Sequence, residues 1–153
     1  MKIVVFSDSH GDISGMEQVV LRERPGLVLH LGDLCRDMDE LQRRFPTQTM
    51  QNVCGNCDGF TEVPDQRILR VEGRRILMCH GHRYRVKEDY GPAVWAAREA
   101  QADILLFGHT HIPYCQQVDG LWVLNPGSCR GRGASCGMIL LEKDKTLCYT
   151  VTV

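Results

Sequence analysis

Short apolar runs alternate with helical patterns through the first third of the chain. The strands that these runs predict cover residues 2–6, 27–31 and 47–52. Between them we expect a helix that Asp12 or Ser14 caps and Pro25-Gly26 ends, and a shorter helix over 37–45. Strands that alternate with helices in this way predict a parallel sheet with helices on its faces.

Strand patterns dominate the rest of the chain. Two turn sequences, Glu72-Gly73 and Asp119-Gly120, predict hairpins because both pairs suit a tight two-residue turn. The longest helical pattern covers 86–101. The remaining predicted strands cover residues 67–71, 75–79, 104–107, 115–118, 121–124, 137–141 and 146–153. The whole pattern predicts a two-sheet α/β domain whose helices cover the outer faces.

Composition limits the class of protein. A chain of 153 residues suits one domain over 1–153, and its 43% hydrophobic and 24% charged content is ordinary for a globular protein. The net charge of -1 indicates no nucleic-acid or membrane surface, and no run is apolar enough to span a bilayer. The N-terminus lacks a secretory pattern, so we expect a cytoplasmic protein whose eight cysteines are reduced.

Polar side chains follow the apolar strands at the points where the strands end. These segments are Asp8-Ser9-His10, Gly32-Asp33, Gly55-Asn56, His80-Gly81-His82 and Gly108-His109-Thr110-His111. Because ligands bind beyond the carboxyl ends of parallel strands in open α/β sheets, we expect the five loops to converge on one place.

The residue types in these loops suit metal ions. Aspartate and histidine supply oxygen and nitrogen ligands, and the pairs Asp8/His10 and His109/His111 have a spacing that points both members the same way in extended chain. The set exceeds the four ligands of one tetrahedral site, so two ions that share a carboxylate fit better. Two ions ~3.5–4 Å apart commonly hydrolyse phosphate esters, with a shared water that attacks phosphorus in line.

The same motifs resemble the calcineurin-like metallophosphoesterases, and more narrowly the small bacterial and archaeal phosphodiesterases of that superfamily. They follow the family order from residue 8 to residue 111, and Asn125-Pro126-Gly127-Ser128 resembles the segment that follows in small members. The resemblance implies a metal-dependent phosphoric ester hydrolase. It also implies a four-layer α-β-β-α sandwich, in which helices flank two mixed central sheets.

The resemblance further implies a ligand set. One ion would bind Asp8, His10 and His111, the other would bind Asn56, His80 and His109, and Asp33 would bridge both. Manganese is the expected metal, with iron, nickel, magnesium and zinc as alternatives. By motif position, the catalytic residues would be Asn56, Cys57, Asp58 and His82.

Cys57 departs from the pattern of many larger relatives, which carry a histidine at this position. A thiol is a poorer acid than imidazole near neutral pH. We therefore expect a preference for good leaving groups such as phenolates.

Several residues allow more than one interpretation. His82 would contact the substrate phosphate, orient His80 or serve the structure alone, whereas His30 matches no motif and is expected to pack in the core. Arg130-Gly131-Arg132 is interpreted as a solvated loop, with a grip on a second phosphate as the alternative. The spacing of Cys54-Gly55-Asn56-Cys57 is explained by the asparagine motif better than by a redox or zinc site.

The expected function is hydrolysis of a small phosphodiester by two divalent ions. A phosphomonoesterase on the same site is one alternative, and a catalytically silent scaffold like the retromer subunit of this fold is the other. Cyclic nucleotides, dinucleoside polyphosphates, glycerophosphodiesters and nucleic-acid ends stay open as substrates. The sequence is compatible with a homodimer and indicates no membrane partner.

Overall fold

The computed structural model describes all 153 residues, which form ten strands in two five-stranded sheets. The first sheet has the order β10-β9-β1-β2-β3. Its strands are β1 (Lys2–Phe6), β2 (Leu27–His30), β3 (Met50–Asn52), β9 (Ser135–Leu141) and β10 (Thr146–Thr152). The predicted parallel arrangement holds for β1, β2 and β3, while β9 and β10 add an antiparallel edge.

The second sheet has the order β4-β5-β6-β8-β7 and is also mixed. Its strands are β4 (Gln66–Val71), β5 (Arg74–Cys79), β6 (Ile104–Leu106), β7 (Tyr114–Val118) and β8 (Leu121–Asn125). Strands β5, β6 and β8 run parallel, and an antiparallel hairpin partner lies at each edge.

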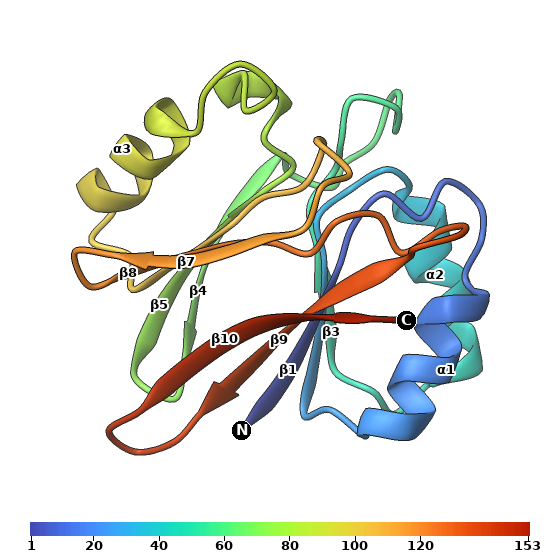
Figure 1. Cartoon of the computed structure of the whole chain (residues 1–153). Coiled ribbons are helices and arrows are strands. Elements are labelled where there is room, and N and C mark those ends of the chain that lie inside the picture. The colour runs from blue at the N-terminus through green and yellow to red at the C-terminus, as the bar shows by residue number, and fades with distance from the viewer.

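Helices cover the outer faces of the two sheets. Helices α1 (Ser14–Glu23) and α2 (Cys35–Arg44) pack on the first sheet, and α3 (Gly91–Glu99) packs on the second. In Figure 1, α1 and α2 lie on one side of the molecule and α3 on the other, with both sheets between them. The expected four-layer sandwich is therefore confirmed.

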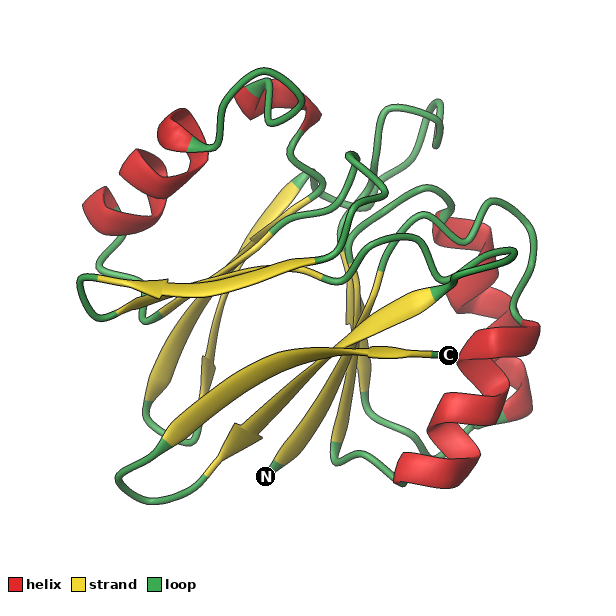
Figure 2. Cartoon of the chain, viewed as in Figure 1, coloured by secondary structure: helices red, strands yellow, loops and turns green.

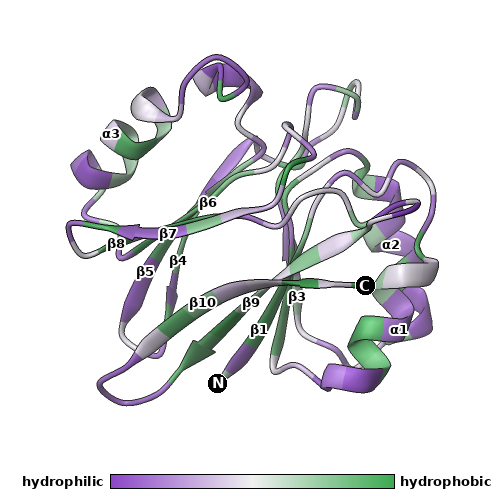
Figure 3. Cartoon of the chain, in the orientation of Figure 1, coloured by the Kyte–Doolittle hydropathy of each residue, from purple (hydrophilic) through white to green (hydrophobic).

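Three apolar clusters hold the layers together. Fourteen buried residues, Val5 and Leu29 among them, fill the space between the two sheets. Val4 faces the opposite way and packs under α1 and α2, because successive side chains of a strand point to opposite faces. In Figure 3 the inner strands β1 and β9 are largely hydrophobic, whereas the helices carry both hydrophobic and hydrophilic faces.

Both predicted hairpin turns are present. Glu72, Gly73, Asp119 and Gly120 all have positive φ, which is the backbone that this kind of two-residue turn requires. All eight cysteines are free in the structure, and five of them are buried.

Two local predictions were wrong. The helical pattern over 86–101 gives a helix that begins only at Gly91, because Pro92 is tolerated in the first turn of a helix but not further inside it. The N-cap of α1 is Ile13, without a side-chain cap. The Asp12 carboxylate instead accepts hydrogen bonds from the amide and hydroxyl of Ser14.

The segments that follow the parallel strands gather at one end of the sandwich. Figure 2 shows these loops together at the top of the view, between α2 and α3. None of the helices is long and apolar enough to cross a membrane.

The burial of Leu29 gives a first test of the fold. Leu29→Ala is expected to lower the free energy of unfolding by about 2–5 kcal/mol, because the side chain is fully buried between the sheets. Leu21→Ala is the matched control, since Leu21 in α1 is 64% exposed and its truncation is expected to change stability by about 0.5 kcal/mol or less. Urea unfolding measures both, and equal effects would contradict the layer arrangement.

Candidate metal centre

The carboxylate of Asp8 lies at the centre of the histidine cluster at this end of the sandwich. Asp8 follows β1 and is fully buried, and its Oδ2 accepts hydrogen bonds from Ser7 Oγ at 2.5 Å and from the His109 amide at 3.1 Å. These two bonds leave Oδ1 to face the histidines. His111 Nε2 lies 3.0 Å from Oδ1, His10 Nε2 lies at 3.7 Å and His80 Nε2 at 3.9 Å.

Two sets of ligand atoms lie side by side around these groups. Within each set the donor atoms are no more than 4.8 Å apart. One set consists of Asp8, His10 and His111, and the other of Asp33, His80 and His109. The structure thus brings together the six aspartates and histidines among the seven predicted metal ligands.

His80 connects the two sheets. It follows β5 of the second sheet, yet its Nδ1 donates a hydrogen bond to the carbonyl of Leu31, which follows β2 of the first. The donor role of Nδ1 leaves Nε2 pointing at Asp33 Oδ2, 3.3 Å away, and at His109 Nδ1, 3.1 Å away. When Nε2 carries no proton, a ring held in this way presents this nitrogen as a metal ligand.

The loops that carry the ligands have an uncommon backbone. Five of the ten non-glycine residues with positive φ are candidate ligands. They are Asp8, His10, Asp33, His109 and His111. Such conformations cost energy and persist where the surrounding structure holds them, which is typical of functional sites.

Glycines allow the loops to close on the carboxylates. A Cβ atom on Gly108 would lie 2.0 Å from Ser7 Oγ, and one on Gly55 would lie 2.0 Å from Asp33 Oδ1. No side chain fits at either position, so both glycines are required for the carboxylates to lie where they do.

The pKa values of the candidate ligands are shifted in different directions. Burial opposes the charge of Asp33, but hydrogen bonds from His80 and from the Cys57 amide outweigh it and lower the pKa of the carboxyl. Burial likewise opposes a charge on His80, yet Asp33 and Asp8 raise its pKa above the usual value. Burial and the neighbouring His80 lower the pKa of His109 to about 4, so this ring is neutral at physiological pH.

The four predicted catalytic residues lie around this cluster in different ways. Cys57 is exposed, and its sulfur forms a third close set with His10 and Asp33. Asn56 is exposed, and its amide donates to the Cys57 sulfur at 3.5 Å. The ring of His82 stands 5.4 Å from that of His80, measured between centroids.

The Asp58 carboxylate lies behind the loop. It accepts hydrogen bonds from the amides of Asp33, Cys35 and Gly55, at 3.1, 2.6 and 2.7 Å. These contacts hold the Asp33 and Gly55 loops together.

The donor set fits divalent ions. His10 Nε2 is buried and has no hydrogen-bond partner, although it faces a buried carboxylate. Asp8 and Asp33 make no ion pair with lysine or arginine, so only imidazoles offset their charge. An orphaned nitrogen beside two buried carboxylates is the arrangement that a bound cation completes.

Residues 1–146 match the calcineurin-like phosphoesterase superfamily domain. The chain belongs to this superfamily. It is 32% identical to the probable metallophosphoesterase YsnB of Bacillus subtilis (strain 168), with 94% of this chain and 86% of that protein covered. It is 28% identical to the phosphodiesterase YfcE of Escherichia coli (strain K12), with 91% and 87% covered.

The fold is shared more widely than the sequence. The structure of Vacuolar Protein Sorting 29 from Cryptosporidium parvum superposes with a TM-score of 0.84, at 21% identity, and covers 99% of this chain and 91% of that one. Family membership and the names of the relatives indicate a phosphoesterase that uses divalent metal ions.

A buried network beneath the phosphoesterase site was not predicted. His30 was expected to pack in the core, and it is fully buried, but its Nε2 donates to Ser9 Oγ at 3.0 Å and its Nδ1 accepts from the Gly32 amide at 3.1 Å. Ser9 in turn donates to Asp37 Oδ2 at 2.5 Å. The network joins the loop of Asp8 to the loop of Asp33. The one feature of the sequence that pointed to it was a polar residue, His30, within an apolar strand.

Metal binding to this site is expected to release protons at low pH. A divalent ion needs the neutral form of His80, and the raised pKa of this ring means that the ion must displace a proton below that pKa. Apparent Mn²⁺ affinity should therefore rise as pH rises through the His80 pKa and level off above it. His109 releases no proton on metal binding above about pH 5, because its pKa is about 4 and the ring is already neutral.

Isothermal titration of the metal-stripped protein in two buffers of different ionisation enthalpy measures the protons released. More protons per bound ion near pH 6.5 than near pH 8 is the expected result, with both values chosen to bracket the titration of histidine. An affinity that does not change between these values, without proton release, would show that His80 does not bind the ion.

Proposed function

We propose that this phosphoesterase hydrolyses small phosphodiesters with two divalent ions, and that manganese is the metal that supports turnover. One observation carries the proposal: two three-ligand sets adjoin each other, and both meet at His80 and the carboxylates of Asp8 and Asp33. When bound, the ions supply the attacking water and offset the charge of the phosphate oxygens. Asn56 would add the seventh ligand through its amide oxygen.

The chain itself would hold and orient the phosphate. His82 Nδ1 is buried without a partner, and burial together with His80 lowers the pKa of this ring. His82 is therefore neutral, and it is placed to donate one hydrogen bond to a phosphate oxygen beside the ligands. Arg130 lies on the opposite loop, where its guanidinium donates to the carbonyl of His10 at 3.2 Å.

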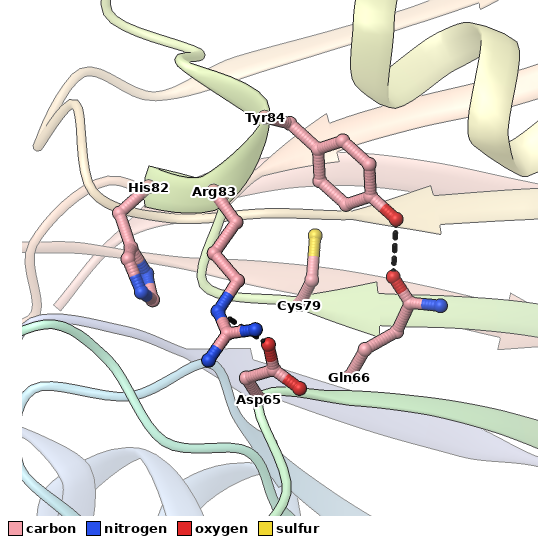
Figure 4. A pocket seen from close by; sticks show the side chains of 7 residues that line it. Asp65, Gln66, Cys79, His82, Arg83 and Tyr84 are labelled. Carbon is pink, nitrogen blue, oxygen red and sulfur yellow. Dashed lines mark hydrogen bonds and ion pairs between the residues drawn. The ribbon is translucent and has the colours of Figure 1, made fainter.

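Two separate hollows, one at His82 and one at Cys57, favour a diester over a monoester. One, of about 330 Å³, is lined by His82, Arg83 and Tyr84, and Figure 4 shows Arg83 paired with Asp65 next to His82. Another, of about 470 Å³, is lined by Cys57 and residues around it. A phosphodiester carries an organic group on each side of phosphorus, whereas a monoester carries one. The name of the Escherichia coli relative supports the same assignment.

A protein-interaction scaffold is the alternative. The fold shared with Vacuolar Protein Sorting 29 is compatible with it. A scaffold does not need a complete set of metal ligands. Here, however, six donor side chains converge, and five of them come from residues with positive φ. These features favour catalysis.

Asp33→Ala tests the function directly. Metal-stripped wild-type protein with added Mn²⁺ is expected to hydrolyse bis(p-nitrophenyl) phosphate faster than p-nitrophenyl phosphate. The diesterase activity of the variant should fall by at least about a hundredfold. The substitution removes a predicted metal ligand, and it also removes the acceptor of the hydrogen bond from the Cys57 amide.

Asp144→Ala is the matched control, since Asp144 is exposed in the turn between β9 and β10. It should keep wild-type activity. No turnover of either ester with any divalent ion, in protein shown to be folded, would favour the scaffold instead.

Cys57→His tests the choice of leaving group. An imidazole at this position protonates an alkoxide better than a thiol does near neutral pH, so turnover of a dialkyl diester should rise by about tenfold or more relative to bis(p-nitrophenyl) phosphate. Phenolates leave without such help, so the aryl diester should change little. Steady-state kinetics with both substrates measure the ratio, and an unchanged ratio would exclude this position as the proton donor.

A further inference from the structure

Cys57 is the exposed member of the eight cysteines, and it lies at the rim of the metal centre. Its amide donates a hydrogen bond to Asp33 Oδ1 at 2.9 Å, which fixes the residue beside a carboxylate of the centre. The Cys57 sulfur, a ring nitrogen of His10 and a carboxylate oxygen of Asp33 all lie within 4.8 Å of one another. The sulfur thus lies within the same 4.8 Å limit that defines the two main sets.

Two neighbours direct this sulfur toward a cation. The Asn56 amide donates to Cys57 Sγ at 3.5 Å, and this contact fixes the position of the sulfur. His10 belongs both to the set with Asp8 and to the set with Cys57, and its Nε2 is the buried nitrogen without a hydrogen-bond partner. A cation that binds His10 and Asp33 therefore has the sulfur as its next neighbour.

The ligand chemistry of such a set differs from that of the rest of the centre. Carboxylate and imidazole accept manganese and magnesium readily, whereas thiolate is a soft ligand that favours zinc and cobalt. A sulfur atom added to nitrogen and oxygen donors shifts the preference of the set toward thiophilic ions.

We propose that Cys57 is a thiolate ligand of this centre, and that with His10 and Asp33 it makes the protein retain zinc or cobalt in preference to manganese. On binding, the thiol proton passes to the buffer and a sulfur lone pair forms the bond to the ion, so no oxidant is needed. With manganese the sulfur stays a thiol. The proposal rests on the metal site of the proposed function and adds a residue and a selectivity to it.

The test uses Co²⁺ as an optical probe of the metal-stripped protein. Cobalt bound to thiolate gives a sulfur-to-metal charge-transfer band in the near ultraviolet, which oxygen and nitrogen ligands do not give. Wild-type protein should show this band together with the visible bands of bound cobalt. Cys57→Ser should lose the ultraviolet band and keep the visible ones, because the other ligands still hold the ion.

Cys54→Ser is the matched control, since Cys54 lies three residues away and belongs to none of the close donor sets. It should keep the ultraviolet band, and circular dichroism checks the fold of both variants. Competition titrations give a second readout: the preference for Zn²⁺ over Mn²⁺ should fall by about tenfold or more in Cys57→Ser.

The outcomes separate this proposal from the proposed function. Visible cobalt bands without an ultraviolet band in the wild type, or an ultraviolet band that persists in Cys57→Ser, would overturn the thiolate ligand and leave the phosphodiesterase intact. Failure of the folded wild-type protein to bind cobalt at all would contradict both.

Discussion

The whole site depends on one electrostatic constraint, which is that two buried carboxylates have no lysine or arginine to neutralise them. Asp8 is fully buried and Asp33 is 2% exposed, and their only ion-pair partners are imidazoles. A buried charge without a compensating partner is strongly unfavourable, so the two carboxylates destabilise the metal-free centre. Divalent cations neutralise these carboxylates, and this neutralisation favours metal binding.

The fold holds this unfavourable arrangement by drawing on both sheets. Loops after β1 and β2 supply the carboxylates, loops after β5 and β6 supply most of the histidines, and His80 joins the two halves through the Leu31 carbonyl. Beneath them, His30, Ser9 and Asp37 connect the carboxylate loops with side-chain hydrogen bonds. The apolar layers keep the strand ends in register, and the strained loops can then be rigid enough to present ligands to a metal.

Much of this was predictable from the sequence, for reasons that particular segments make clear. Strands such as Lys2–Phe6 are apolar throughout, and the turns at Gly73 and Gly120 need positive φ, so both patterns have few alternatives. Helix α3 was predicted too long because apolar periodicity continues before Gly91, whereas the proline that sets the start acts through backbone sterics. The six converging ligands followed from motif order. The hydrogen-bond network of His30 could not be predicted, because the sequence of a buried strand does not show which groups its polar residue contacts.

The central claim is that this chain binds two divalent ions side by side. Crystals grown with Mn²⁺ and measured near the manganese absorption edge would locate them directly. We expect two anomalous difference peaks, one in contact with Asp8, His10 and His111 and the other in contact with His80 and His109, with Asp33 between them. A single peak, or none at full metal concentration, would contradict a dinuclear centre and the phosphodiesterase built on it.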